Sequence, residues 1–131
     1  MKLKSLTPNL MVNDVEETIE YYTDILGFTL LKTVPEKGEL DWAMVKRGDI
    51  VLMFQSKKSL ANELPRLKGE KPGGGLTLYI QVDSITELHE ELYHNEVEII
   101  SDLESTFYDT IEFTIVDVNG YILTFSEEKA P

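Results

Sequence analysis

The strongest constraint on the fold of this chain is an internal repeat with a spacing of 70 to 71 residues. Residues 12–15 (VNDV) correspond to residues 82–85 (VDSI), and residues 52–55 (LMFQ) correspond to residues 123–126 (LTFS). A repeat of this kind indicates two similar structural units built from one supersecondary pattern. A chain of 131 residues has room for two such modules.

The first half predicts a strand, a helix and three further strands. Asp14 is a typical N-cap residue, Glu17 completes a capping box, and Gly27 is typical of a helix end. Between them the apolar residues recur at helical spacing, at Val15, Ile19, Tyr22 and Leu26. We predict a helix over 14–26 and strands over 6–12, 28–34, 41–46 and 50–55. Pro8 lacks a backbone donor, so the first strand is expected at a sheet edge.

The second half predicts the same order of elements. Ser84 is expected to cap a helix, and Asn95 is expected to end it in the left-handed conformation. Asp117, Asn119 and Gly120 are turn residues between two apolar runs, which predicts a hairpin. We predict a helix over 84–95 and strands over 76–82, 97–101, 110–116 and 121–126, with a loop over 102–106.

Residues 57–75 connect the two halves and have a different composition, rich in Lys, Glu, Pro and Gly. A short helix is expected within 59–67, and the glycines at 73–75 predict a mobile connection. A phosphate-binding Walker loop needs Gly-Lys-Ser/Thr at its end, whereas Lys71 precedes these glycines. The segment is therefore interpreted as a linker.

The charge and composition exclude several classes of protein. The formal net charge of -12 disfavours binding to nucleic acid, whose phosphates would be repelled. It favours attraction of a cationic ligand, although acidity is also common among bacterial cytosolic proteins. There is no cysteine and no apolar run of the roughly 20 residues that span a membrane. We expect a cytoplasmic protein without a membrane partner.

Together these patterns predict an α+β fold of two β-α-β-β-β modules. The expected domain spans 1–131, with the first module at about 1–56, the connector at 57–75 and the second module at about 76–131. Each module has one helix for its four strands, so one face of each sheet stays open. We expect a curved mixed sheet around a shared cleft, which is a typical setting for a ligand.

Three segments resemble the vicinal oxygen chelate superfamily, which includes glyoxalase I, extradiol dioxygenases and bleomycin resistance proteins. They are residues 10–14 (LMVND), 21–28 (YYTDILGF) and 117–125 (DVNGYILTF). The resemblance covers nearly the whole chain apart from the connector. It implies the glyoxalase/bleomycin resistance fold and a homodimer, since relatives form dimers. One fold hosts many activities, so the resemblance alone does not assign a function.

The resemblance also implies where a metal would be held. Metal-using relatives place His, Gln or Glu on the first and last strands of each module, and these positions fall at Thr7, Met53, Thr77 and Thr124. Divalent metals prefer imidazole, carboxylate or amide ligands. A shift of two residues adds only the amides of Asn9 and Gln55. We therefore expect no metal and no other cofactor.

The two histidines do not form a metal motif. His89 and His94 are five residues apart, which places them about 140° apart around a helix. We expect both to be structural or surface residues. Acid or base chemistry would then fall to a carboxylate, and Glu112 is the candidate because its strand should line the cleft. A solvated strand glutamate is the alternative interpretation.

Strand alternation predicts which side chains line the cleft. Three aromatic residues, Trp42, Phe107 and Tyr108, are expected either at the mouth of the cleft or in core or dimer packing. The predicted ligand-binding set is Trp42, Val51, Met53, Gln55, Thr77, Tyr79, Phe107, Tyr108, Glu112 and Thr124.

Two functions fit these features. The first is metal-free binding of a small aromatic or cationic molecule, as in the bleomycin resistance branch, where sequestration gives antibiotic resistance. The second is a metal-dependent lyase or dioxygenase of the glyoxalase I or extradiol type. A structural or regulatory role without either activity remains a third interpretation.

Overall fold

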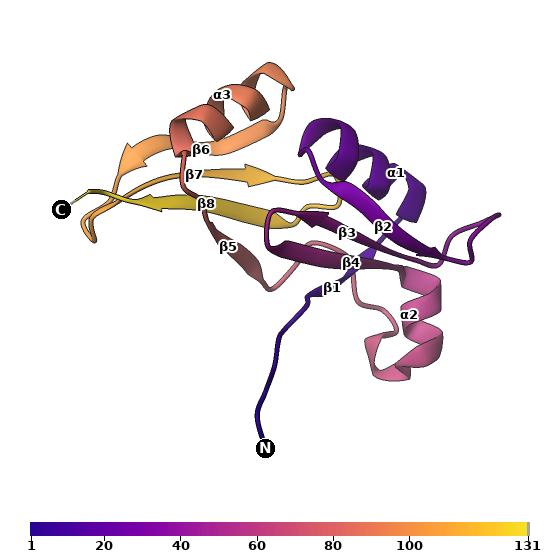
Figure 1. Cartoon of the computed structure of the whole chain (residues 1–131). Coiled ribbons are helices and arrows are strands. Elements are labelled where there is room, and N and C mark those ends of the chain that lie inside the picture. The colour runs from indigo at the N-terminus through magenta and orange to yellow at the C-terminus, as the bar shows by residue number, and fades with distance from the viewer. Residues whose placement is uncertain (131) are drawn as a thin grey trace. The chain divides into compact units, whose positions relative to one another are not determined.

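The computed structural model describes residues 1–130, and its backbone forms two compact units (Figure 1). The first unit is Met1–Pro72, and the second begins at Gly73. Each unit contains a four-stranded sheet with three antiparallel strands and one parallel edge strand. No helix in the described part of the chain is long and apolar enough to cross a membrane.

The first unit has the predicted β-α-β-β-β order. Its strands are β1 (Asn9–Val12), β2 (Thr29–Val34), β3 (Trp42–Arg47) and β4 (Ile50–Ser56), in the sheet order β1-β4-β3-β2. Helix α1 (Val15–Glu20) continues into a π-helical turn (Tyr21–Ile25). A second helix, α2 (Lys57–Glu63), and a 3-10 turn (Pro65–Leu67) follow β4. The prediction of strand β1 at a sheet edge is confirmed.

The second unit repeats this order without the extra helix. Its elements are β5 (Thr77–Gln81), α3 (Ile85–His94), β6 (Glu98–Ser105), β7 (Thr110–Val116) and β8 (Ile122–Glu128). The sheet order β5-β8-β7-β6 is equivalent to that of the first unit. The predicted helices and strands are thus confirmed, most of them to within one or two residues.

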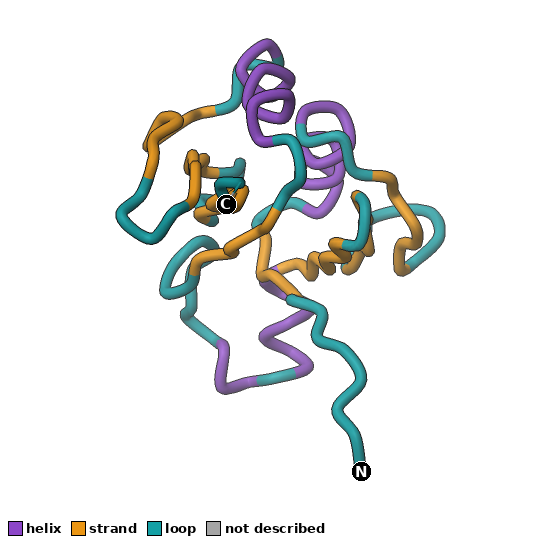
Figure 2. The backbone as a smooth tube through the Cα atoms, turned by 60° about the vertical axis from the view of Figure 1, so that its left-hand side comes forward, coloured by secondary structure: helices purple, strands orange, loops and turns teal. Residues whose placement is uncertain are grey.

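In each unit one sheet face packs against a helix, and the cores follow from strand alternation (Figures 1 and 2). In the first unit, Tyr22 of the helix lies edge-on or tilted against Phe28 and Phe54, with ring centroids 5.4 and 4.7 Å away. In the second, Leu92 of α3 and Phe113 of β7 are each 1% exposed. Burying such side chains contributes roughly 1.5–3 kcal/mol each, which fixes the helix-facing side of each sheet.

The helix ends differ in part from the sequence prediction. Asp14 caps α1 as expected, accepting a 3.0 Å hydrogen bond from the backbone N–H of Glu17. The prediction that Ser84 caps α3 is wrong, because its side chain makes no capping bond. The carboxylate of Glu127 accepts the N–H of Ile85 instead, at 2.9 Å. Asn95 is also not the left-handed residue, since Glu96 has the positive φ of 62°.

The hairpin between β7 and β8 forms as its turn residues predict. The Asp117 carboxylate accepts hydrogen bonds from the backbone N–H groups of Asn119 at 2.9 Å and Tyr121 at 2.8 Å. Asp117 and Asn119 are both buried, so the turn is a rigid part of the second unit.

Two strand boundaries were predicted incorrectly. Strand β6 continues to Ser105, whereas a loop was expected over 102–106. Two register shifts against β7 allow the strand to stay paired past Ser101. Strand β1 begins at Asn9 rather than at residue 6, and residues 1–6 extend away from it (Figure 1). Just before β1, the carbonyl of Pro8 accepts a hydrogen bond from the backbone N–H of Met53 in β4.

Gly73 lies against the hairpin turn rather than in a free linker. Its φ is +93°, and a Cβ built on it would lie 2.6 Å from the backbone oxygen of Asn119. A Cβ on Gly74 would meet nothing within 4 Å. The two neighbouring glycines therefore have different structural roles.

We predict that Gly73→Ala lowers the free energy of unfolding by on the order of 2 kcal/mol, because it combines a left-handed backbone with a backbone clash. Gly74→Ala is the matched control and should change stability by less than about 0.5 kcal/mol. Urea denaturation of both variants measures the difference. Equal stability of the two would contradict the close packing of Gly73.

Candidate functional site

The face of the second sheet opposite α3 carries polar side chains. Paired residues of neighbouring strands share a face, and the pairs Tyr79–Thr124, Thr114–Thr124 and Glu112–Ser126 all lie on this one. The alternate residues, among them Phe113 and Phe125, fill the core. Thr114 and Thr124 hydrogen-bond to each other across the strands at 2.9 Å.

Glu112 is the centre of a cluster of hydroxyl groups on this face. Its side chain is nearly buried, with 9% of its surface exposed. One carboxylate oxygen, Oε2, accepts hydrogen bonds from three hydroxyls, those of Tyr79 at 2.5 Å, Ser126 at 3.0 Å and Thr110 at 3.0 Å. The other, Oε1, accepts one from Tyr108 at 2.8 Å. The cluster is drawn from β5, β7, β8 and the β6–β7 turn.

The hydroxyl donors decide the charge of Glu112. Burial alone would raise the pKa of this carboxyl, because it disfavours the charged form. The hydrogen bonds from Tyr79, Tyr108, Thr110 and Ser126 outweigh burial, and the pKa is lowered from its ordinary value of 4.5. Glu112 is therefore ionised at neutral pH. The same bonds to Glu112 raise the pKa of the Tyr79 and Tyr108 phenols, which stay protonated.

The β6–β7 turn presents two aromatic rings beside the cluster. Thr106 and Thr110 close the turn through a 2.7 Å bond between their hydroxyls and a 2.9 Å backbone bond. Phe107 is 98% exposed and packs edge-on against Tyr108, with ring centroids 4.9 Å apart. The turn thus holds an exposed aromatic residue against Tyr108, which donates to the Glu112 carboxylate.

The first sheet places four other predicted site residues on one face. Cross-strand pairing aligns Trp42 with Gln55 and Met44 with Met53, and Val51 has the same strand parity as Met53. Gln55 accepts a 2.8 Å bond from Asn9 and donates 3.0 Å bonds to Ser59 and Glu63 of α2. This face combines Trp and Met side chains with an amide whose donor and acceptor are both engaged.

The residues at the positions implied for a metal do not form a suitable ligand set. Thr124 is bonded to Thr114, and Met53 is a poor ligand for hard divalent ions. The shifted positions, Asn9 with Gln55 and Tyr79 with Ser126, form side-chain hydrogen bonds within their own units, at 2.8 and 2.9 Å. The described residues contain no group of three or more His, Cys, Asp or Glu placed to hold a metal ion. We derive no chemistry through a metal here.

The histidines lie on α3, which packs on the sheet face opposite the Glu112 cluster. His89 bonds Asp102 of β6 at 2.7 Å and packs edge-on against Phe113, with ring centroids 5.0 Å apart. His94 lies 3.9 Å from Glu90 on the same helix. The His89 bond connects α3 to β6, and the His94 contact stays within α3. This agrees with a structural role for His89.

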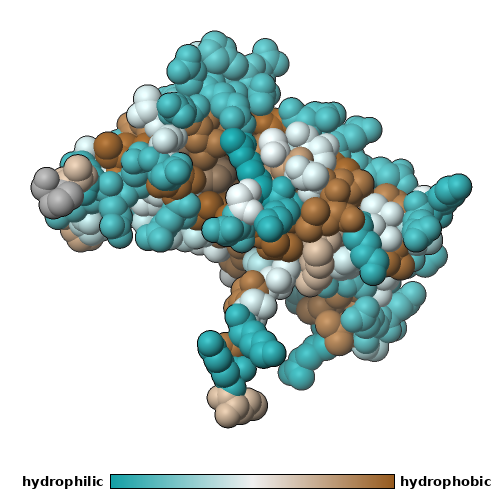
Figure 3. Space-filling view, in the orientation of Figure 1, coloured by the Kyte–Doolittle hydropathy of each residue, from teal (hydrophilic) through white to brown (hydrophobic). Residues whose placement is uncertain are grey.

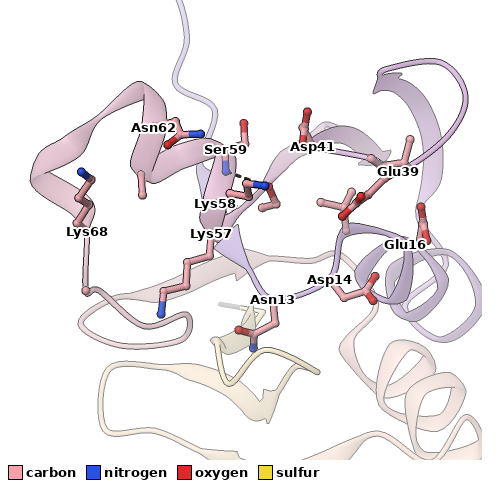
Figure 4. Close-up of a pocket in the computed structure, with 15 residues that line it drawn as sticks. Asn13, Asp14, Glu16, Glu39, Asp41, Lys57, Lys58, Ser59, Asn62 and Lys68 are labelled. Atoms are coloured by element: carbon pink, nitrogen blue, oxygen red, sulfur yellow. Dashed lines mark hydrogen bonds between the residues drawn. The ribbon is translucent and has the colours of Figure 1, made fainter.

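The first unit also has an open hollow of about 1080 Å³ (Figure 4). It lies between the start of α1, the segment before β3 and helix α2. Its wall carries Lys57, Lys58 and Lys68 together with Asp14, Glu16, Glu39 and Asp41. These side chains are all exposed. Solvated surface charges of both signs explain this lining, so we do not treat the hollow as the functional site.

The structure brings together Tyr79, Tyr108 and Glu112 of the predicted set, with Phe107 and Thr124 beside them. Thr77 lies on the same face, two residues before Tyr79. The predicted ligand-binding set omitted Thr110 and Ser126, although Thr110 has the same strand parity as Glu112, and Ser126 was expected to face the cleft by its parity with Thr124. Thr7 precedes β1 and belongs to no sheet.

The comparisons with known proteins identify the family. The model of the Glyoxalase/Bleomycin resistance protein/Dioxygenase superfamily matches residues 3–125. The chain belongs to this superfamily. A search of curated proteins gives no match.

Solved structures with the same fold cover nearly the whole chain. TioX from Micromonospora sp. ML1 has a TM-score of 0.75 and 17% identity, covering 95% of this chain and 98% of that one. A glyoxalase/bleomycin resistance protein/dioxygenase from Nocardioides has a TM-score of 0.80 and 17% identity, covering 98% and 85%. A superfamily member from Sphaerobacter thermophilus has a TM-score of 0.78 and 17% identity, covering 97% and 98%. At this identity the likeness shows the fold.

We predict that Glu112→Gln lowers stability at pH 7 by about 1–3 kcal/mol, because four hydroxyl donors lose a charged acceptor. The folded pKa of Glu112 lies below its unfolded value. Its stabilising effect is therefore complete above about pH 4.5 and is lost as the pH falls through the lower folded pKa. Thermal unfolding from pH 7 to pH 3 should show the difference between variant and wild type shrinking in acid.

Glu104→Gln is the matched control, because Glu104 is exposed and lies opposite Glu112 on β6. It should leave the pH dependence of stability as in the wild type. A wild-type pH profile in the Glu112→Gln variant would mean that Glu112 is not ionised in the folded protein.

Proposed function

We propose that this protein binds a small, planar, cationic molecule on the open face of its second sheet, without a metal and without chemical turnover. The observation that carries the proposal is the ionised, nearly buried Glu112 held by four hydroxyl groups. Buried charges are costly unless they are paired or hydrogen-bonded. Among the described residues the partners of this buried charge are hydroxyl groups. A cationic ligand would provide the opposite charge.

The two carboxylate oxygens of Glu112 accept different numbers of hydrogen bonds. A carboxylate offers about four acceptor positions, two on each oxygen. Oε2 accepts three hydroxyls, whereas Oε1 accepts the single hydroxyl of Tyr108 among the described residues. Oε1 therefore has one acceptor position that a donor from a ligand would use. An ammonium, amidinium or guanidinium N–H would form a charge-assisted bond there.

The two phenols extend this negative site toward the surface. Tyr79 and Tyr108 are 54% and 50% exposed, and both donate their hydroxyl hydrogen to Glu112. A hydroxyl that donates to an anion becomes a better acceptor, because hydrogen bonds in a chain polarise one another. The phenol oxygens are thus suited to accept further N–H groups of the ligand. Their raised pKa keeps them protonated, so they do not act as bases at neutral pH.

Exposed aromatic faces favour a ligand that is flat as well as cationic. Tyr108 donates to Glu112 and Phe107 packs against Tyr108, and both rings keep much of their surface exposed. Such faces stack on planar rings and attract cations, worth roughly 0.5–1 kcal/mol at exposed sites. The net charge of -12 raises the local concentration of cations and speeds their capture at low salt.

Family membership supports a small-molecule role but leaves the type of role open. The superfamily name joins glyoxalases, bleomycin resistance proteins and dioxygenases. Sequestration of a harmful cationic compound is the form of binding we favour. Metal-dependent lyase or dioxygenase activity is the alternative, and the donor set at the family's metal positions does not favour it. We also propose a cytoplasmic location.

We predict that calorimetry will detect binding of planar aromatic cations, with benzamidine as the smallest probe, and that binding weakens in high salt. The neutral isostere benzamide should bind at least about tenfold more weakly, since a charge-assisted bond contributes roughly 1.5–3 kcal/mol. Glu112→Gln should remove this preference, and Phe107→Ala should weaken the binding of both probes. Glu36→Gln removes the same charge from an exposed turn of the first unit and serves as the control.

Equal binding of benzamidine and benzamide by the wild type would contradict the cation site. Failure of both probes, together with glyoxalase or dioxygenase turnover on adding metal, would favour the alternative. Metal analysis of purified protein gives an independent check. Stoichiometric Ni, Zn, Mn or Fe would contradict the metal-free proposal.

A further inference from the structure

Strand β6 carries a β-bulge at Asp102 and Leu103. Its pairing with β7 shifts by one residue there, so these two residues lie opposite Phe113 alone. Bulges bend a strand and often redirect side chains beside functional sites. This bulge comes directly before the β6–β7 turn, whose residues Phe107 and Tyr108 belong to the proposed binding site.

The bulge decides which residues close that turn. Beyond it Glu104 pairs with Glu112, and the same register leads to the two bonds between Thr106 and Thr110. Without the bulge the pairing would slip by one residue, and such a slip turns side chains to the other face of a sheet. Tyr108, which lies inside the turn, would then lose its place on the Glu112 carboxylate.

Helix α3 contacts the bulge from the covered face of the sheet. Figure 3 shows hydrophilic residues on the outer side of α3 and hydrophobic residues where the helix meets its sheet. The His89 side chain of α3 is 19% exposed, and its ring lies edge-on to Phe113. Its Nε2 lies 2.7 Å from Oδ1 of Asp102. One ring thus contacts both strands at the bulge.

Asp102 connects this helix contact to the backbone of the bulge. The same Oδ1 accepts the backbone N–H of Leu103 at 2.7 Å. The bond from Leu103, followed by the bond from His89, lowers the pKa of the Asp102 carboxyl from its ordinary value of 3.8. Asp102 is therefore ionised at neutral pH and can only accept, so Nε2 of His89 carries the proton. Charge-assisted bonds of this kind are stronger than neutral ones.

We propose that His89 is a positioning residue whose bond to Asp102 holds the β6 bulge and so keeps Tyr108 in place on Glu112. His89 lies on the face opposite the site and acts through the strand rather than on the ligand. The inference deepens the proposed function and rests on it for the ligand that the site binds. The contact between His89 and Tyr108's turn can be tested in the free protein.

Two substitutions separate the hydrogen bond from the packing. His89→Leu keeps an apolar contact with Phe113 but donates no hydrogen bond, whereas His89→Gln keeps an N–H donor. Carbon-13 NMR titration of the Glu112 carboxyl reports on Tyr108, because the Tyr108 bond lowers the pKa of Glu112. His89→Leu should raise the titration midpoint in the same direction as Tyr108→Phe. His89→Gln should keep the midpoint near that of the wild type.

The matched control is His94→Leu, the same substitution at a 71% exposed side chain of the same helix. It should leave the Glu112 midpoint unchanged. The double variant His89→Leu with Tyr108→Phe should titrate like Tyr108→Phe alone, because residues that act through one contact are not additive. A variant that is only less stable keeps its folded midpoint, so the titration distinguishes positioning from a general loss of stability.

Calorimetry with benzamidine tests the consequence for binding. His89→Leu should bind this probe roughly two- to fivefold more weakly than the wild type, the factor expected for a lost contact with an exposed aromatic ring. His89→Gln should recover most of the affinity, because it retains the donor to Asp102.

A Glu112 midpoint that His89→Leu leaves at the wild-type value would overturn the proposal. A double variant whose midpoint lies above that of Tyr108→Phe would also overturn it, because His89 would then act on Glu112 by another route. If the wild type does not bind benzamidine while the midpoints shift as expected, the proposed function fails and the positioning role of His89 is supported.

Discussion

The alternation of side chains along the strands is the constraint on which the rest of this structure depends. Each sheet has one helix-covered face, and the buried apolar residues of its inner strands lie there. The opposite face does not have to fill this core, so it can carry polar residues. In the second unit this freedom allows a carboxylate, two phenols, three threonines and a serine to lie side by side.

Duplication explains how two different surfaces arise on one framework. The pairs Asn9–Gln55 and Tyr79–Ser126 occupy equivalent positions in the two units, and each forms a diagonal hydrogen bond between a parallel edge strand and its neighbour. In the first unit the pair is extended to Ser59 and Glu63 of α2. In the second it is extended to Glu112. The same backbone geometry thus supports an amide network in one unit and a charged hydroxyl cluster in the other.

Sequence patterns were sufficient for the elements and for part of the site, because both depend on local periodicity. Strand parity predicted that Tyr79 and Thr124 line the cleft, Glu112 was selected because its strand was expected to line it, and the residues Asp117 to Gly120 predicted the β7–β8 turn. Two of the failures involve partners distant in sequence. Ser84 gives way to Glu127 as the partner of the α3 N-terminus, and β6 is prolonged by register shifts against β7. The ionised state of Glu112 likewise depends on hydroxyls from three strands and a turn, which no local pattern reveals.

Glu112 is a nearly buried carboxylate that hydroxyl donors keep charged, and we propose that this charge binds a cation. Carbon-13 NMR titration of the Glu112 side-chain carboxyl tests this claim most directly. We predict a titration midpoint below the ordinary value of 4.5 in the free protein, and a further decrease when a planar cation is bound. A midpoint above 4.5, or one that the cation leaves unchanged, would contradict it.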